Sequence, residues 1–320
     1  MTTRSAPGVA TLRALIARAT LAPSPHNLQP WRWTLHADHA ELELDEPAAE
    51  LLARHDPAAR ELVMSCGAAL LTLRVAAAEA LFDARVDLLP DPHRPVLLAD
   101  VTLVSGAVDA AFSTLDAVVP LRRTAWGAFD DRPLPVGLAQ RLRVEAMAEA
   151  AQLVEVGRAD RGPLSDLLQE ADLERFRSDH RTIPADRLTA AREAELLVEA
   201  PYVGVLGTDG DGVADWLAAG QALQRVLLVA AADAVLGGFL NAPCQVEAER
   251  DRLRVLLPTV HWPQTVLRLG YPTERPAASA RRPVDEVVVV QDGPAEAGHA
   301  RGTSDTPLDA GVDFSEDTLG

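Results

Sequence analysis

The sequence contains no lysine and only two cysteines, and each shortage excludes something. All 30 residues counted as lysine or arginine are arginine, so arginine is the only fixed cation available to an anionic ligand. Cys66 and Cys244 show no CxxC spacing and no histidine cluster around either. This pattern argues against a zinc site or a disulfide framework and predicts two buried free thiols.

Long apolar runs are also scarce. The longest, at 226–240, is interrupted by Asp233 and is shorter than the roughly 20 residues of a spanning helix. No segment is therefore expected to cross a membrane. The N-terminus lacks a basic start followed by an apolar core, which predicts a cytoplasmic protein without a secretory signal. The formal net charge of −17 argues against nucleic acid or an anionic membrane surface as a partner.

Hydrophobic periodicity predicts alternating helices and strands in a chain long enough for one large domain or two ordinary ones. The alternation of Trp31, Trp33 and Leu35 with Leu42 and Leu44 indicates a hairpin whose tryptophans lie in the core rather than against a ligand. Other helices are expected at 8–20, 58–82, 136–150, 164–200 and 214–236, and other strands at 100–104, 152–158, 201–207 and 265–271. Residues 291–320 are rich in Gly, Pro and acid, which predicts a disordered acidic tail.

Parts of the sequence occur twice. A helical pattern that begins at Gly67 is repeated from Gly220, and the pattern LLPxxHxP stands at 88–95 and again at 256–263. Because each copy lies between a long helix and a strand, we interpret the chain as an internal duplication. The expected division is a first half at 1–116, a second half at 117–290 and the tail.

Arginine pairs and a polar turn are the candidate functional features. The stretch PSPHNLQPW begins at Pro23, RRT stands at 122–124, and ARRPVDEVV contains Arg281 and Arg282. Adjacent guanidinium groups suit bidentate binding of phosphate, whereas Arg225, alone in a helix, is interpreted as a solvated charge. The histidines show no HxxxH or HExxH spacing, so no metal site is assigned.

These segments resemble the FMN-dependent nitroreductase family. PSPHNLQPW is similar to its PSxxNxQPW segment, RRTAWGAF to its phosphate-binding opening, and GQALQRVLLVAAADAVLGG with PQTVLRLGYP to its central helix and following strand. Together with RELVMSCGAAL and RRPVDEVV, they most resemble the Acg-type branch, in which two nitroreductase-like halves share one chain. The resemblance implies an α+β nitroreductase-like fold, with mixed sheets flanked by helices and an internally duplicated pseudo-dimer that acts as a monomer.

The resemblance also implies one FMN per chain, because the first half supplies PSPHN and the second supplies RRT and the late arginines. No catalytic residue is assigned. The expected FMN-binding residues are Pro23, Ser24, Asn27, Arg122, Arg123, Thr124, Gly237, Gly238 and Arg281 or Arg282. Asn27 and Gln29 could instead be plain turn residues, and His26 could be a structural donor or a site residue. Ala125, Trp126 and Gly127 depart from the arginine-rich pattern of the branch.

The function that the resemblance implies is flavin oxidoreduction. NAD(P)H would reduce the flavin, which would pass electrons to a nitroaromatic, quinone or similar flat acceptor. An alternative is an FMN storage protein in which residues 158–200 form a lid. A third possibility is the specialised oxidation of a metabolite or of flavin itself, because one fold hosts several chemistries.

Overall fold

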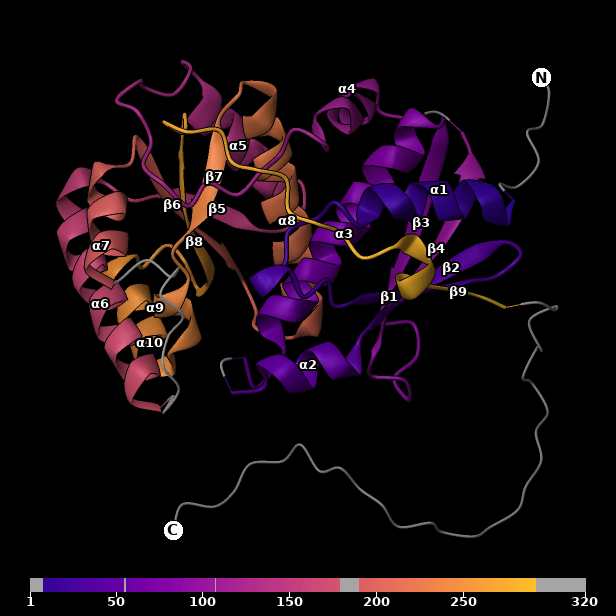
Figure 1. The fold of residues 1–320 in the computed structure, drawn as a ribbon, viewed down its shortest axis with the longest axis horizontal. Coiled ribbons are helices and arrows are strands. Elements are labelled where there is room, and N and C mark those ends of the chain that lie inside the picture. The colour runs from indigo at the N-terminus through magenta and orange to yellow at the C-terminus, as the bar shows by residue number, and fades with distance from the viewer. Residues whose placement is uncertain (1–7, 55, 107, 179–189, 292–320) are drawn as a thin grey trace, which may run out of the picture.

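The computed structural model describes residues 8–54, 56–106, 108–178 and 190–291. These residues form a five-stranded sheet with strand order β3-β4-β2-β1-β9 and a four-stranded sheet with order β5-β6-β8-β7. We call the five-stranded sheet and its helices the first lobe, and the four-stranded sheet and its helices the second lobe (Figure 1). The expected disordered tail lies outside the described residues, except for Gln291.

The chain builds most of the first lobe before it enters the second. In order, the first lobe contains α1 (Val9–Ala19), the 3₁₀ helix η1 (Pro25–Asn27), β1 (Trp31–Leu35), β2 (His39–Leu44), α2 (Glu46–Leu52), α3 (Arg60–Glu79), β3 (Phe82–Leu88), β4 (Leu97–Ser105), α4 (Ala110–Ser113) and η2 (Thr114–Val118). The expected hairpin is confirmed as β1 and β2, and both of its tryptophans are fully buried. Alternation predicted this pair well because one strand face lies against the core.

The second lobe follows and sends the end of the chain back to the first. It contains α5 (Leu138–Met147), β5 (Gln152–Glu155), η3 (Arg158–Asp160), α6 (Arg161–Ser178), α7 (Ala190–Glu199), β6 (Tyr202–Thr208), α8 (Val213–Ala232), β7 (Leu236–Phe239), α9 (Ala242–Gln245), α10 (Glu247–Leu256) and β8 (Trp262–Gly270). Helix α11 (Val284–Val287) and strand β9 (Val288–Val290) complete the described chain. Strand β9 pairs in parallel with β1, so the last strand of the chain belongs to the first lobe (Figure 1).

The two sheets share one topology. In the first lobe the antiparallel neighbours are β3–β4, β4–β2 and β2–β1, and in the second they are β7–β8, β8–β6 and β6–β5. Each set of four strands is interrupted after its second strand by a 20-residue helix, α3 or α8. This correspondence is what the proposed duplication requires, whereas β9 has no counterpart in the four-stranded sheet.

Helices α3 and α8 pack against each other at the centre of the molecule (Figure 1). A Cβ added to Gly67 would fall on the carbonyl oxygen of Leu217, and one added to Gly220 would fall on that of Met64. Each glycine therefore meets the residue three positions before the other glycine. This reciprocal contact is the pattern of an isologous interface between two related helices.

The expectation that no segment is a membrane-span candidate is wrong for helix α3. By length and composition alone, α3 qualifies as a candidate span, with a mean hydropathy of 1.5 in its most apolar window. In the structure 94% of that window is buried, because both lobes pack around it. Its apolar character is thus explained by its place in the protein core. Cys66 on this helix and Cys244 on α9 are free and buried, as expected.

The interpretation of Arg225 as a solvated charge is wrong. Its side chain is 17% exposed and pairs with Glu145 and Glu149, with N–O distances of 2.5 and 2.8 Å. Glu149 also accepts a hydrogen bond from Arg74 of α3 at 2.6 Å. The result is an ion-pair network that ties α8 and the end of α5 to α3. The acids responsible stand 76 or more positions away in the sequence, so the periodicity of α8 gave no sign of them.

Candidate functional site

The polar turn at residues 23–29 has a strained backbone held by its own side chains. His26, Asn27 and Gln29 have positive φ angles of 49°, 57° and 53°, a conformation unusual for residues other than glycine. The hydroxyl oxygen of Ser24 accepts a hydrogen bond from the Gln29 amide at 3.0 Å, and the Gln29 side chain donates to the Asn27 carbonyl at 3.2 Å. Clustered strain of this kind is typical of functional segments.

The turn clamps the returning C-terminal segment. The Asn27 side chain donates to the carbonyl oxygen of Ala280 at 2.8 Å and accepts from the Arg281 guanidinium at 2.9 Å. The Gln29 side chain accepts from the amide of Arg282 at 3.0 Å. Asn27 and Gln29 are thus more than plain turn residues, since together they fix the position of Arg281 in the first lobe.

Arg281 completes a cationic cleft between the lobes. Its guanidinium also donates to the carbonyl oxygens of Thr20, Leu21 and Ala22 at 2.7, 3.2 and 3.2 Å. The cleft has a volume of 80 Å³ and is lined by Leu21, Val119, Pro120, Arg122, Arg123, Thr124, Ala278, Ser279 and Arg281. We call it the arginine cleft. Among the described residues its lining contains no carboxylate.

Arg122 is the most deeply buried cation of the arginine cleft. It is 5% exposed, and one hydrogen bond, from Nη2 to the Leu21 carbonyl at 3.3 Å, is recorded for its side chain. Its Nε and Nη1 atoms are buried and have no hydrogen-bond partner among the residues that the structure describes. Burial, followed by repulsion from Arg281 and Arg123, lowers the pKa of Arg122 to about 9. The side chain therefore stays charged at neutral pH and has no acidic partner among the described residues.

Arg281 and Arg282 have different neighbours in the structure. Arg281 lines the arginine cleft, and burial together with the charge of Arg123 lowers its pKa. Arg282 lies outside that lining and faces acids, with its guanidinium 3.6 Å from a carboxylate oxygen of Asp45 and 3.5 Å from one of Glu286. The structure thus brings Arg281, but not Arg282, together with Arg122 and Arg123.

Gly237 and Gly238 stand on strand β7, beside the RRT segment at 122–124. Thr124 forms a parallel bridge with Gly237, and the amide of Ala125 donates to the carbonyl of Gly237 at 2.8 Å. A Cβ on Gly238 would fall on the carbonyl oxygen of Ala125. Close packing against this segment therefore already requires a glycine at position 238.

Arg268, which was not among the expected site residues, holds the same segment from β8. This side chain is 2% exposed, donates to the carbonyls of Ala125 and Trp126 at 2.9 and 3.1 Å, and lies 4.6 Å from the ring centre of Phe129. Burial lowers its pKa to about 10. The available signal was an arginine within an otherwise apolar strand pattern, because a charge at such a position needs a specific partner.

A larger cavity lies apart from the arginine cleft and shares no lining residue with it. It has a volume of 290 Å³ and is lined by Asp131, Pro133, Leu134, Pro135, Gly137, Ala139, Glu155, Arg158, Pro201 and Tyr202. None of the expected FMN-binding residues is among them. The arginine cleft is smaller than the roughly 300 Å³ or more of a typical whole-cofactor pocket, and its size suits a phosphate group.

No model of a known protein family matches the sequence. The chain is 29% identical over 300 residues to the Mycobacterium tuberculosis protein named "Putative NAD(P)H nitroreductase Rv3131", a match that covers 83% of this chain and 86% of that protein. It is 28% identical over 328 residues to "Putative NAD(P)H nitroreductase acg" of the same organism, with 88% and 96% covered. These matches confirm the resemblance of the chain to the nitroreductases and, within them, to the Acg-type branch.

Solved structures give a weaker match. A Desulfovibrio desulfuricans protein named "putative nitroreductase in complex with fmn" is 18% identical with a TM-score of 0.41, covering 56% of this chain and 98% of that one. The NADPH:FMN oxidoreductase of Vibrio harveyi, complexed with NAD⁺, is 13% identical with a TM-score of 0.41, covering 60% and 79%.

Proposed function

We propose that the protein binds one FMN per chain and uses it as an NAD(P)H-dependent oxidoreductase, reducing a nitroaromatic, quinone or similar flat acceptor. The observation that carries this proposal is the buried charge of Arg122, which has no acidic partner among the described residues and lies in a cleft with Arg123 and Arg281. A phosphate group would supply the missing anion. The names of the mycobacterial relatives support NAD(P)H as the electron donor.

The arginine cleft fits the phosphate end of FMN. Buried charges are normally paired, and hydrogen bonds to charged groups contribute about 1.5–3 kcal/mol each. Arg122 has two nitrogen atoms, Nε and Nη1, without a hydrogen-bond partner among the described residues, and Arg281 is already fixed by Asn27 and three carbonyl oxygens. Arg123 is anchored by its own backbone neighbours, Pro120 and Arg122, at 2.5 and 2.8 Å. The charges are thus positioned before a ligand arrives, which lowers the entropic cost of binding.

The flavin ring would lie outside the cleft, near the turn and β7. Pro23, Ser24 and Asn27 are proposed along one side of the ring, and the backbone of Gly237 and Gly238 along another. The Ser24 hydroxyl, whose oxygen accepts from Gln29, keeps its own proton to donate. When bound, FMN would accept hydride from NAD(P)H and pass electrons on. The protein would bind and orient the cofactor.

The same proposal includes the architecture. Asn27 and the Leu21 carbonyl come from the first half of the chain, at 1–116, whereas Arg122 and Arg281 come from the second, at 117–290. A single chain would then complete a site that a family dimer builds from two subunits. On this basis we propose that the protein acts as a monomeric pseudo-dimer in the cytoplasm.

FMN storage is not favoured as the main function. The lid that it would need, at 158–200, is represented by α6 and α7, which pack on each other, while α6 also contacts α9 and α10 (Figure 1). No residue of either helix is among those that line the arginine cleft. Residues 179–189 of the expected lid lie outside the described part of the chain.

The direct experiment is to measure FMN content and reduction. Protein purified with FMN should be yellow, contain one FMN per chain, and bleach promptly when mixed anaerobically with NADPH or NADH. Flavin that bleaches with dithionite but ignores both nucleotides would disprove the reductase and support storage. A chain that binds no FMN would disprove both.

A matched pair of variants tests the site. Arg281→Gln should weaken FMN binding at least about tenfold, the equivalent of one lost charged hydrogen bond. Arg282→Gln should leave the FMN affinity unchanged, because the Arg282 side chain faces Asp45 and Glu286 outside the cleft. Both should retain the wild-type circular dichroism spectrum. Equal FMN affinity in the two variants would remove Arg281 from the site.

A further inference from the structure

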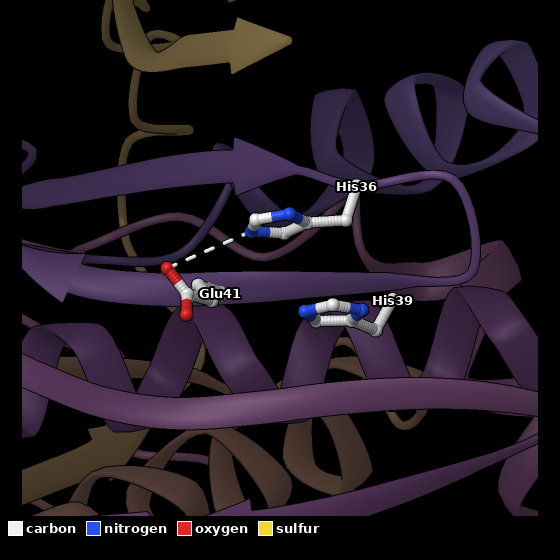
Figure 2. Close-up of side chains that lie close together, drawn as sticks. All are labelled: His36, His39 and Glu41. Atoms are coloured by element: carbon white, nitrogen blue, oxygen red, sulfur yellow. Dashed lines mark ion pairs between the residues drawn. The ribbon is translucent and has the colours of Figure 1, made fainter. Parts of the chain in front are cut away.

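The turn between β1 and β2 places two imidazoles and a carboxylate side by side. His36 follows β1, and His39 and Glu41 stand on β2, two positions apart and hence on one face of the strand. The rings of His36 and His39 stack with centroids 4.1 Å apart and an interplanar angle of 5°. Figure 2 shows the His36 ring directed towards the Glu41 carboxylate.

The separations of the polar atoms suit a shared metal ion. One potential ligand atom from each of His36, His39 and Glu41 lies within 4.8 Å of the other two. Nε2 of His36 is 3.7 Å from Oε2 of Glu41, and Nε2 of His39 is 3.5 Å from Oδ2 of Asp100 on β4. Two ligand atoms at about 2.1 Å from a tetrahedral zinc ion lie roughly 3.4 Å apart.

The surrounding hydrogen bonds leave Nε2 of His36 and Nε2 of His39 available to bind a metal ion. Nδ1 of His39 is 2.8 Å from a carboxylate oxygen of Asp38, which directs Nε2 to a second partner, as in carboxylate–histidine–metal arrangements. Nε2 of His36 is buried with no hydrogen-bond partner among the described residues. Buried nitrogen atoms of this kind are normally hydrogen-bonded, whereas the carboxylate oxygen recorded beside this one, Oε2 of Glu41, is 3.7 Å away.

Glu41 is held ready by Arg94. The guanidinium donates to both carboxylate oxygens of Glu41 at 2.8 Å and to Glu43 at 2.8 Å. Each carboxylate oxygen has two lone pairs, so Oε2 can accept from Arg94 and still bind a cation. This bidentate contact fixes the carboxylate, and the two histidine rings would have to turn from their stacked arrangement to bind the same ion.

We propose that His36, His39, Glu41 and Asp100 bind one divalent transition-metal ion, with Zn²⁺ as the best match. Imidazole nitrogens with carboxylate oxygens are ligands that zinc accepts in a tetrahedral site. With four protein ligands the site is closed, so its role is structural. The ion links β1, β2 and β4 at the end of the hairpin. The ligands meet across a turn and a neighbouring strand, which explains why helical histidine spacings did not reveal them.

Zinc titration of the untagged, EDTA-treated and desalted full chain tests the proposal. Calorimetry should show one Zn²⁺ per chain with micromolar or tighter affinity, and zinc should raise the melting temperature. His39→Gln should weaken binding at least tenfold, and Asp38→Asn should weaken it about 10–100-fold. His261→Gln is the matched control, because His261 is exposed on the second lobe and pairs with Asp209. It should bind zinc as the wild type does.

Two further readouts separate binding from folding. All variants should melt in EDTA at the wild-type temperature, which shows that the fold is intact. Cobalt(II) added to the wild-type protein should give the intense visible absorption of a tetrahedral site, a result that needs no variant. Absence of saturable zinc binding, a weak octahedral cobalt spectrum, or equal affinity in His39→Gln and the wild type would overturn the proposal. None of these outcomes depends on FMN.

Discussion

The first and second lobes share a strand order but differ in the segments that surround it. Both place a 20-residue helix between two pairs of antiparallel strands. The first lobe adds the clamping turn at 23–29, and the second adds the RRT segment and two helix pairs, α6–α7 and α9–α10. A common scaffold therefore builds a nearly symmetric interface, whereas the arginine cleft depends on the parts that are not shared.

The largest expected effect tests the symmetric part. Gly220→Ala and Gly67→Ala should each destabilise the protein by about 3 kcal/mol or more, because the new methyl group meets a backbone carbonyl of the facing helix and overpacks the interface. Chemical denaturation measures both. Gly162→Ala on α6 is the control, since nothing lies within 4 Å of its Cβ position. A large cost at only one glycine would break the comparison between α3 and α8.

A second prediction concerns the ion pairs that join the lobes on one side. Glu149→Gln should cost about 2 kcal/mol, because it leaves the charges of Arg74 and Arg225 without their shared, 5% exposed carboxylate. Thermal unfolding of the variant measures the loss. As a control, Glu195→Gln removes the exposed partner of Arg192 and should change stability by less than about 0.5 kcal/mol. Equal losses in the two variants would show that the network is not special.

The third prediction tests the C-terminal segment that returns to the first lobe as α11 and β9. Val287 is 1% exposed and packs in the core of the first lobe, so Val287→Ala should cost about 1.5 kcal/mol for the methyl groups removed. Val289→Ala is the control, since Val289 is 46% exposed. Stability measured in urea should fall only for the first variant. An unchanged midpoint for Val287→Ala would mean that packing of the returning segment at α11 contributes little to the first lobe.

The smallest expected effect is a change in stability that differs in sign between the FMN-free and the FMN-bound protein. Arg122→Met removes a buried charge that has no acidic partner among the described residues, so the FMN-free protein should become more stable by about 1 kcal/mol. The same variant should lose the stabilisation that FMN gives to the wild type. Melting temperatures with and without FMN measure both effects. A variant that FMN still stabilises fully would exclude Arg122 from the phosphate site.

The sequence predicted the long elements better than the short ones. The alternation of Trp31 and Trp33 predicted a buried hairpin. The ends of α3 and α8 were predicted within a few residues of those observed. Strands β3, β7 and β9 were not predicted. β7 and β9 have four and three residues, too few for a periodic pattern, so pairing with a neighbour is what makes them strands.

The candidate site divides in the same way. The motifs pointed to Asn27, Arg122 and Arg281; in the structure Arg122 and Arg281 line one cleft, and Asn27 accepts a hydrogen bond from Arg281. The sequence could not separate Arg281 from Arg282, because the distinction comes from Asp45 and Glu286, which pair with one of them. It also gave no reason to connect His36 with Asp100.

By itself, the sequence determined the long helices and most of the longer strands, which faces of the hairpin are apolar, and that arginine is the only fixed cation available to an anion. These properties follow from local periodicity and composition. Only the tertiary structure decided which arginines have buried nitrogen atoms without a hydrogen-bond partner among the described residues, which glycines touch across α3 and α8, and which lobe receives β9. Such facts depend on contacts between residues far apart in the chain, where packing and burial set the energy of each charge.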